Sequence, residues 1–109
     1  MAKFITIGYG DRAGYESTAE VVREAAHTHD ARLREAGAVM GAAGDPVRVR
    51  NHDGAGTRTD EGPYMRSDLP VAGFALIEAA DIGEATRLVS QTPCAVAQGV
   101  VEIWPLTAP

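Results

Sequence analysis

The stretch VAGFALIEAADIGEATRLVSQ, residues 71–91, decides the fold that the sequence predicts. Its first nine residues are mostly apolar and include branched and aromatic side chains, which is typical of a central β-strand. Asp81 then provides a helix N-cap, and Glu84 completes the acidic variant of a capping box. One helical stripe follows, made of Ile82, Ala85, Leu88 and Val89. We therefore predict a strand that leads into a helix, which Pro93 ends.

The N-terminal part of the chain repeats this order of strand and helix. KFITIGY, residues 3–9, alternates two sets of side chains and contains β-branched residues, as strands do. STAE at Ser17–Glu20 has the spacing of a capping box, so we predict a helix from there to Ala36, just before Gly37. Its apolar stripe consists of Val22, Ala26, Leu33 and Ala36.

The segment between these two units predicts a long, bent strand over residues 38–51, because Gly and Pro in its middle indicate a kink. NHDGAG, residues 51–56, predicts a hairpin turn at its Asp-Gly pair, with a short return strand at 57–59. GVVEIWPL, residues 99–106, predicts the last strand. The order β-α-β-hairpin-β-α-β predicts an α+β, ferredoxin-like domain with an extra hairpin and an antiparallel sheet.

The whole chain, residues 1–109, is expected to be one domain that forms a homodimer. Two helices cover only one face of such a sheet, and a second copy is the simplest way to bury the other face. The net charge of −5 and the pI of about 5.0 argue against binding to nucleic acid. No apolar run approaches the roughly 20 residues of a membrane span, and the start lacks a signal-peptide pattern, so we expect no membrane contact and a cytoplasmic protein. The single cysteine, Cys94, excludes an internal disulfide and is expected to be a small buried apolar residue.

The stretch TDEGPYMRSDLPVAGFALIEAADIGEA, residues 59–85, resembles the signature region of YCII-related proteins, also called the DGPF type. EGPY at 61–64 stands where that family has Asp-Gly-Pro-Phe, and a Gly-Phe pair follows at 73–74 at the expected distance. TPCAVAQGVVEIWPL, residues 92–106, is similar to the family's ending. The resemblance implies a ferredoxin-like fold that pairs into a dimeric α+β barrel. It also implies a cleft with a His-Asp pair, and relatives of muconolactone-isomerase type.

Four residues are candidate catalytic groups. His29 lies on the apolar stripe of the first helix and could act as a general base, or it could be a core histidine with one satisfied hydrogen bond. Asp60 and Glu61 precede a Gly-Pro turn, and either could take the role of the signature Asp. Tyr64 follows that turn. The alternative for this corner is structural, with a carboxylate that caps backbone amides and a tyrosine that packs. His27 falls off the stripe and is expected on the solvated face.

Several cations near the hairpin are candidate substrate-binding groups. Arg48 and Arg50 share one strand face, and Arg66 follows the Gly-Pro turn. Together they could bind a carboxylate, which suits the guanidinium fork. The alternative is a solvated hairpin with surface ion pairs. Tyr9, at the end of the first strand, could reach the same cleft or could be a core aromatic.

These candidates predict a cofactor-free acid–base enzyme of isomerase or lyase type, acting on a small anionic or enolic substrate. The sequence has no His/Cys cluster at metal spacing, no phosphate-binding Gly loop and no nucleophile elbow, so we expect neither a metal nor another cofactor. The alternative is a non-catalytic dimeric module that binds a small ligand or a protein in a regulatory role.

Overall fold

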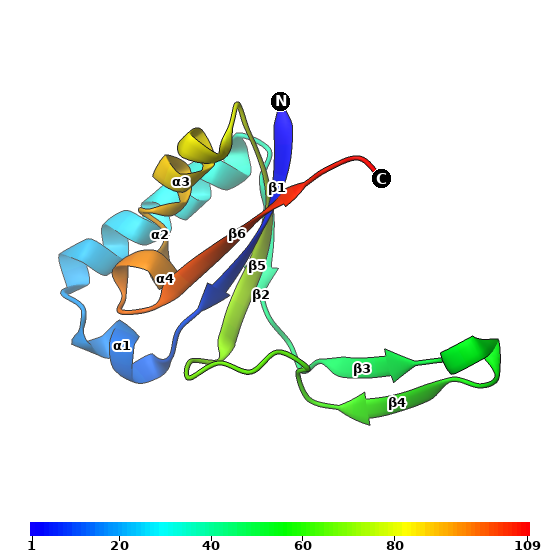
Figure 1. Ribbon diagram of the computed structural model, residues 1–109. Coiled ribbons are helices and arrows are strands. Elements are labelled where there is room, and N and C mark those ends of the chain that lie inside the picture. Colours follow the sequence, from blue (N-terminus) through cyan, green and yellow to red (C-terminus); the bar gives the residue numbers. More distant parts are fainter.

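A four-stranded antiparallel sheet forms the centre of the protein. The computed structural model describes all 109 residues, Met1–Pro109, and shows an α+β protein (Figure 1). The sheet has the strand order β2-β5-β1-β6, and each neighbouring pair runs antiparallel. Its strands are β1 (Ala2–Tyr9), β2 (Val39–Ala42), β5 (Val71–Ala79) and β6 (Val100–Leu106). The predicted α+β class and antiparallel sheet are therefore confirmed.

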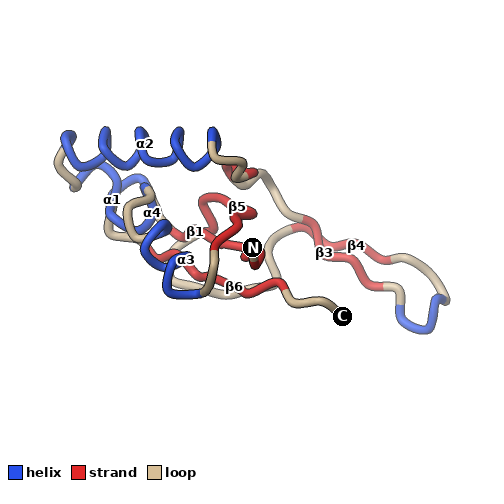
Figure 2. The backbone as a smooth tube through the Cα atoms, turned by 90° about the horizontal axis from the view of Figure 1, so that it is seen from above, coloured by secondary structure: helices blue, strands red, loops and turns tan.

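All four helices lie on one side of this sheet, as two perpendicular views show (Figures 1 and 2). They are α1 (Arg12–Ser17), α2 (Glu20–Glu35), α3 (Ile82–Val89) and α4 (Pro93–Val96). The core joins Phe4 and Ile77 of the sheet to Ala85 and Val89 of α3. Only 13 of the 109 residues are buried, so the core of a single protomer is small. No helix is both long enough and apolar enough to cross a membrane.

The opposite face of the sheet carries no helix and is largely apolar. The strand register aligns one row across all four strands, namely Val39, Leu76, Ile5 and Trp104. Phe74 lies in the next row, opposite Ile7. Phe74 and Trp104 keep 48% and 55% of their surface exposed, which is unusual for large apolar side chains on a central sheet. We call this surface the open face.

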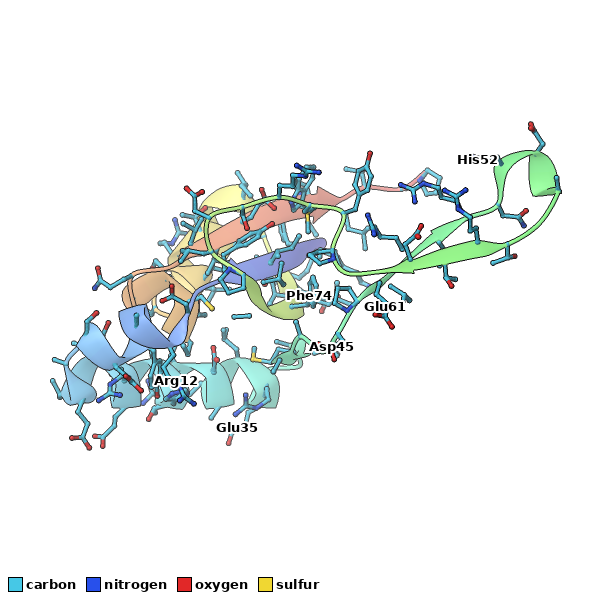
Figure 3. All side chains as sticks on the ribbon, turned by 90° about the horizontal axis from the view of Figure 1, so that it is seen from below. Arg12, Glu35, Asp45, His52, Glu61 and Phe74 are labelled. Atoms are coloured by element: carbon cyan, nitrogen blue, oxygen red, sulfur yellow. The ribbon has the colours of Figure 1, made fainter.

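The hairpin leaves the body of the protein as a separate arm. β3 (Val47–Arg50) and β4 (Arg58–Glu61) form their own two-stranded sheet, and we call residues 47–61 the arm. The predicted continuous strand over 38–51 is therefore wrong, because ladder pairing with β5 ends at Ala42 and the chain turns away before Pro46. The predicted turn is confirmed, since Asp53 and Gly54 have φ values of 60° and 68°. His52 marks the tip of the arm and Glu61 its base (Figure 3).

The first helical region differs from the prediction at its start. Ser17 does not cap the long helix; it ends α1, and its hydroxyl donates to the Gly14 carbonyl. Asp11 caps α1 by accepting a hydrogen bond from the Gly14 amide, and the sequence analysis predicts no helix at these residues. α2 begins at Glu20 without a side-chain cap. Its end is as predicted, because Gly37 takes a φ of 109°, which favours glycine.

The second helical region confirms most of its prediction. The Asp81 carboxylate accepts a hydrogen bond from the Glu84 amide at 2.8 Å, as an N-cap should. The Glu84 carboxylate in turn accepts from the Ala80 amide. Pro93 was expected only to end this helix, but it begins α4. Proline suits the first turn of a helix because the amide that it lacks has no partner there.

Candidate functional site

A cavity of about 360 Å³ lies between α2 and the helix-covered face of the sheet. Of its 19 lining residues, 10 are hydrophobic, and backbone of β2 and β5 forms one wall. Its charged and titratable side chains are His27, Asp30 and Arg34 of α2 and Cys94 of α4. The α2 residues are spaced by three and four positions, so they lie on one face of the helix. The cavity is thus mostly apolar with one polar wall.

Asp30 is the central group of this polar wall. It is half-buried, and burial raises the pKa of its carboxyl above the ordinary value, although the positive charges of Arg34 and the histidines oppose this shift. The two ion pairs of the protein are Arg12–Glu16 and Arg50–Asp60, so Asp30 belongs to neither. Its carboxyl therefore has no ion-pair partner in the protein.

A contact between the first two helices positions His27. The Tyr15 hydroxyl of α1 lies 2.7 Å from His27 Nε2, and the two rings are 5.8 Å apart between centroids. Arg23 packs its guanidinium 4.9 Å above the centre of the Tyr15 ring, in a cation–π contact. His27 is exposed, as expected, but it also lines the cavity.

A second, open hollow adjoins the cavity beside α1. The two share Ala72, Pro93 and Cys94 in their linings. Four charged side chains line the hollow: Asp11, Arg12, Glu16 and Arg23. Asp11 caps α1 and Arg12 pairs with Glu16 at 3.8 Å, whereas Arg23 Nε is buried without a hydrogen-bond partner. Arg23 is thus the cation here that could bind an anionic group.

Cys94 lies where the cavity and the hollow meet. Burial, together with the negative charge of Asp30, raises the pKa of its thiol, so the thiol stays protonated near neutral pH. A Cβ atom on Gly8 would lie 2.9 Å from Cys94 Sγ, so glycine at this position of β1 makes room for the sulfur. The expectation of a small apolar residue fits this environment, although Cys94 is half-buried rather than fully buried.

The predicted catalytic base, His29, is engaged elsewhere. Its Nε2 lies 2.6 Å from the Leu88 carbonyl oxygen, and because a carbonyl only accepts, this nitrogen donates. His29 does not line the cavity. This position matches the alternative of a core histidine with one satisfied hydrogen bond, and its catalytic role stays a prediction.

The other predicted site residues lie on or near the arm. Arg50 pairs with Asp60 at 3.2 Å, and Arg48 donates to the Glu61 carbonyl at 3.0 Å. Tyr64 is exposed and lines a shallow hollow with both arginines. Arg66 is exposed in the following loop. Neither the cavity nor this hollow contains His29.

Tyr9 lies on the open face rather than in the cavity. Its hydroxyl donates to Glu102 Oε1 at 3.2 Å and also contacts Met65 Sδ at 3.6 Å. Burial, with a contribution from the Glu102 carboxylate, raises the pKa of Tyr9. Met65 belongs to the loop after the arm, so this contact fastens the loop over one end of the sheet.

No protein-family model matches the chain, and no curated protein matches it. The resemblance to YCII-related proteins therefore stays a prediction. No group of three or more His, Cys, Asp or Glu side chains lies together in a way that could hold a metal ion. One signal for the cavity was present in the sequence. His27 and Asp30 are three residues apart on one helix, a spacing that also suits a surface pair.

Proposed function

We propose that this protein is a small acid–base enzyme of isomerase or lyase type that acts on a small anionic or enolic substrate without a cofactor. The observation that carries this proposal is the convergence of Asp30, His27 and Arg34 on one wall of a mostly apolar cavity. An apolar cavity strengthens electrostatic interactions and adjusts the proton affinity of a carboxyl, which acid–base catalysis requires. This site replaces the combination of His29 with the arm carboxylates that the sequence favoured.

In the proposed mechanism, the ionised Asp30 removes a proton from a carbon next to a carbonyl or carboxylate group of the substrate. The electron pair of the broken C–H bond moves to the substrate oxygen, and an enolate forms. Arg34 and His27 stabilise the negative oxygen. Protonated Asp30 then returns the proton to a different carbon, which completes an isomerisation. Loss of a leaving group from the neighbouring carbon instead would give a lyase reaction.

Arg23 is proposed to hold an anionic group at the far end of the substrate. Its guanidinium has an unpaired, buried Nε and is oriented by the Tyr15 ring. Since the hollow of Arg23 shares its lining with the cavity, one elongated ligand can contact both. Tyr15 would then serve both regions, because it also bonds to His27.

The functional unit is proposed to be a homodimer of ferredoxin-like subunits, paired as in the dimeric α+β barrel of YCII-related proteins. The strand order β2-β5-β1-β6, with helices on one face only, supports the ferredoxin-like arrangement. The exposed apolar row on the open face supports pairing with a second copy through that face.

One observation also favours the alternative of a non-catalytic binding module. More than half of the residues that line the cavity are hydrophobic, a composition that suits ligand binding as well as catalysis. The two functions differ in whether bound ligand exchanges protons with the protein.

The test is a small-molecule thermal-shift screen of 2-oxo carboxylic acids and unsaturated lactones, followed by proton NMR of each ligand in D₂O. We expect the enzyme to catalyse exchange of a carbon-bound hydrogen for deuterium. Asp30→Asn should slow this exchange by about 10²–10⁴-fold, the usual contribution of one general base. Asp45→Asn, at an exposed carboxylate outside the cavity, is the matched control and should leave the rate unchanged.

The outcomes separate the competing roles. Exchange that survives Asp30→Asn but is lost in His29→Ala would transfer the role of the base to His29. Ligands that stabilise the protein without any exchange would support the binding module.

A further inference from the structure

Within a single chain, the arm has few contacts that could stabilise it. An isolated two-stranded hairpin is marginally stable in water, and this one has only four paired positions on each strand. One of these pairs places Arg50 directly opposite Arg58, a like-charge pair that destabilises the hairpin. Val47 and Val49, on its other face, are each 63% exposed. The arm therefore lacks the apolar partner surface that a hairpin of this size needs.

The shape of the protomer leaves the arm without such a surface. The radius of gyration is 15.8 Å, whereas a compact chain of this length has about 13 Å. Figures 1 and 2 show that the arm extends from the open-face side of the sheet, away from all four helices. A second copy that packs on the open face would lie on this same side.

The length of the arm determines how far it would reach along such a copy. β3 (Val47–Arg50) spans about 10 Å at the usual rise of a strand, and the turn at His52–Gly54 extends the arm further, whereas two packed sheets lie about 10 Å apart. The tip, with His52 (Figure 3), would therefore reach beyond the sheet of the second copy. An arm of this length does not fit between the two sheets, so it must run along an edge.

The charges of the arm permit a contact with the acidic rest of the chain. The arm contains Arg48, Arg50 and Arg58 against Asp53, Asp60 and Glu61, so its net charge is zero. The whole net charge of −5 therefore belongs to the remaining residues. An arm without net charge is not repelled by the acidic body of another copy.

We propose that the arm of each subunit lies along the flank of the second subunit, with Val47 and Val49 packed against it, so that two arms clasp the dimer reciprocally. This inference rests on the dimer proposed above and adds the element that fastens it. In a dimer with twofold symmetry the two contacts are equivalent, because each arm packs on the same region of the other subunit.

The test combines sedimentation equilibrium with limited trypsin digestion, because trypsin cleaves after Arg48, Arg50 and Arg58. We expect the wild-type protein to dimerise, and its arm to be cut about ten-fold more slowly as a dimer than after dilution to monomer. The Val47→Asp/Val49→Asp double variant should weaken the dimer by about ten-fold or more, through lost apolar burial. Val21→Asp, at an exposed valine of α2, is the matched control and should dimerise as the wild type does.

Each remaining outcome has a definite meaning. A dimer that is unaffected by the double variant, with an arm cut equally fast in both states, would overturn the clasp and leave the dimer intact. A wild-type protein that stays monomeric at all concentrations would overturn the proposed dimer and the clasp with it. The digestion of the wild-type protein decides the question even if the double variant fails to fold.

Discussion

Asp30, the base of the proposed reaction, is expected to make stability depend on pH. Its carboxyl is half-buried beside apolar residues, and burial raises its pKa. The folded protein therefore binds this proton more tightly than the unfolded chain does. The protonated carboxyl therefore favours folding at low pH. This contribution is lost as the pH rises from the carboxyl pKa of the unfolded chain through the raised pKa of the folded protein. Above that window, folding must bury part of a negative charge.

Replacement of this carboxyl should therefore stabilise the protein in a pH-dependent way. We expect Asp30→Asn to raise the free energy of unfolding relative to wild type near pH 7, and to lose this advantage near pH 3.5. The gain should stay below about 1 kcal/mol, because solvent screens a half-exposed group. Urea denaturation at the two pH values measures it. A gain that grew towards low pH would mean that the folded protein favours the charged carboxylate.

Residue identity alone did not reveal the candidate site. The sequence singled out His29 because it lies on the apolar stripe of α2, and the structure does place it half-buried. The sequence provided no reason to prefer Asp30. Whether that residue lines a cavity depends on how far α2 lies from the sheet. Arg23 was missed for a similar reason, since its partner Tyr15 lies in a helix that the sequence did not predict.

At the scale of the element, long periodic segments could be predicted and short ones could not. β1, β5 and β6 and the two longer helices follow from their apolar spacing and from the Asp81 cap. α1 has six residues and α4 has four, too few to display a stripe. The arm strands were recognisable from alternation, but alternation does not show whether a strand joins the main sheet. Whether β3 joins the main sheet depends on the path of the segment between Ala42 and Pro46.

The junction of α4 and β6 is the tightest point among these elements. A Cβ atom on Gly99 would lie 2.6 Å from the Cys94 carbonyl oxygen and closer still to the Tyr9 carbonyl oxygen. Both are backbone atoms, which cannot rotate away. We expect Gly99→Ala to lower the free energy of unfolding by about 1–3 kcal/mol, as overpacking does.

Chemical denaturation of both alanine variants measures this effect. The matched control is Gly44→Ala, since a Cβ atom on Gly44 would meet no atom within 4 Å. Equal stability of the two variants would mean that the α4–β6 junction can relax without cost.

At the scale of the whole molecule, the protomer leaves two apolar surfaces uncovered, the open face and the valine side of the arm. The open face and the arm both lie on the side away from the helices (Figure 2). The sequence predicts the first surface, because two helices cannot cover both faces of a sheet. It could not predict the direction of the arm, which only the three-dimensional path of the chain defines. A single partner that approaches from this side would bury both surfaces.

The open face provides the most direct test of that assembly. Phe74, in a central strand of the open face, and Ile82, on the helical side, have nearly equal exposure at 48% and 50%. Lysine at either position is therefore equally tolerable in an isolated protomer. In a dimer paired through the open face, however, Phe74→Lys would bury a charge in the row of Glu102, whose carboxylate already accepts a hydrogen bond from Tyr9, and the twofold axis would bring in a second lysine. We expect Phe74→Lys to weaken the dimer by on the order of 100-fold, and Ile82→Lys to leave it unchanged, as measured by sedimentation velocity over a range of concentrations. If Ile82→Lys dissociated the dimer and Phe74→Lys did not, the subunits would have to pair through their helices, and the arm would then point away from the partner.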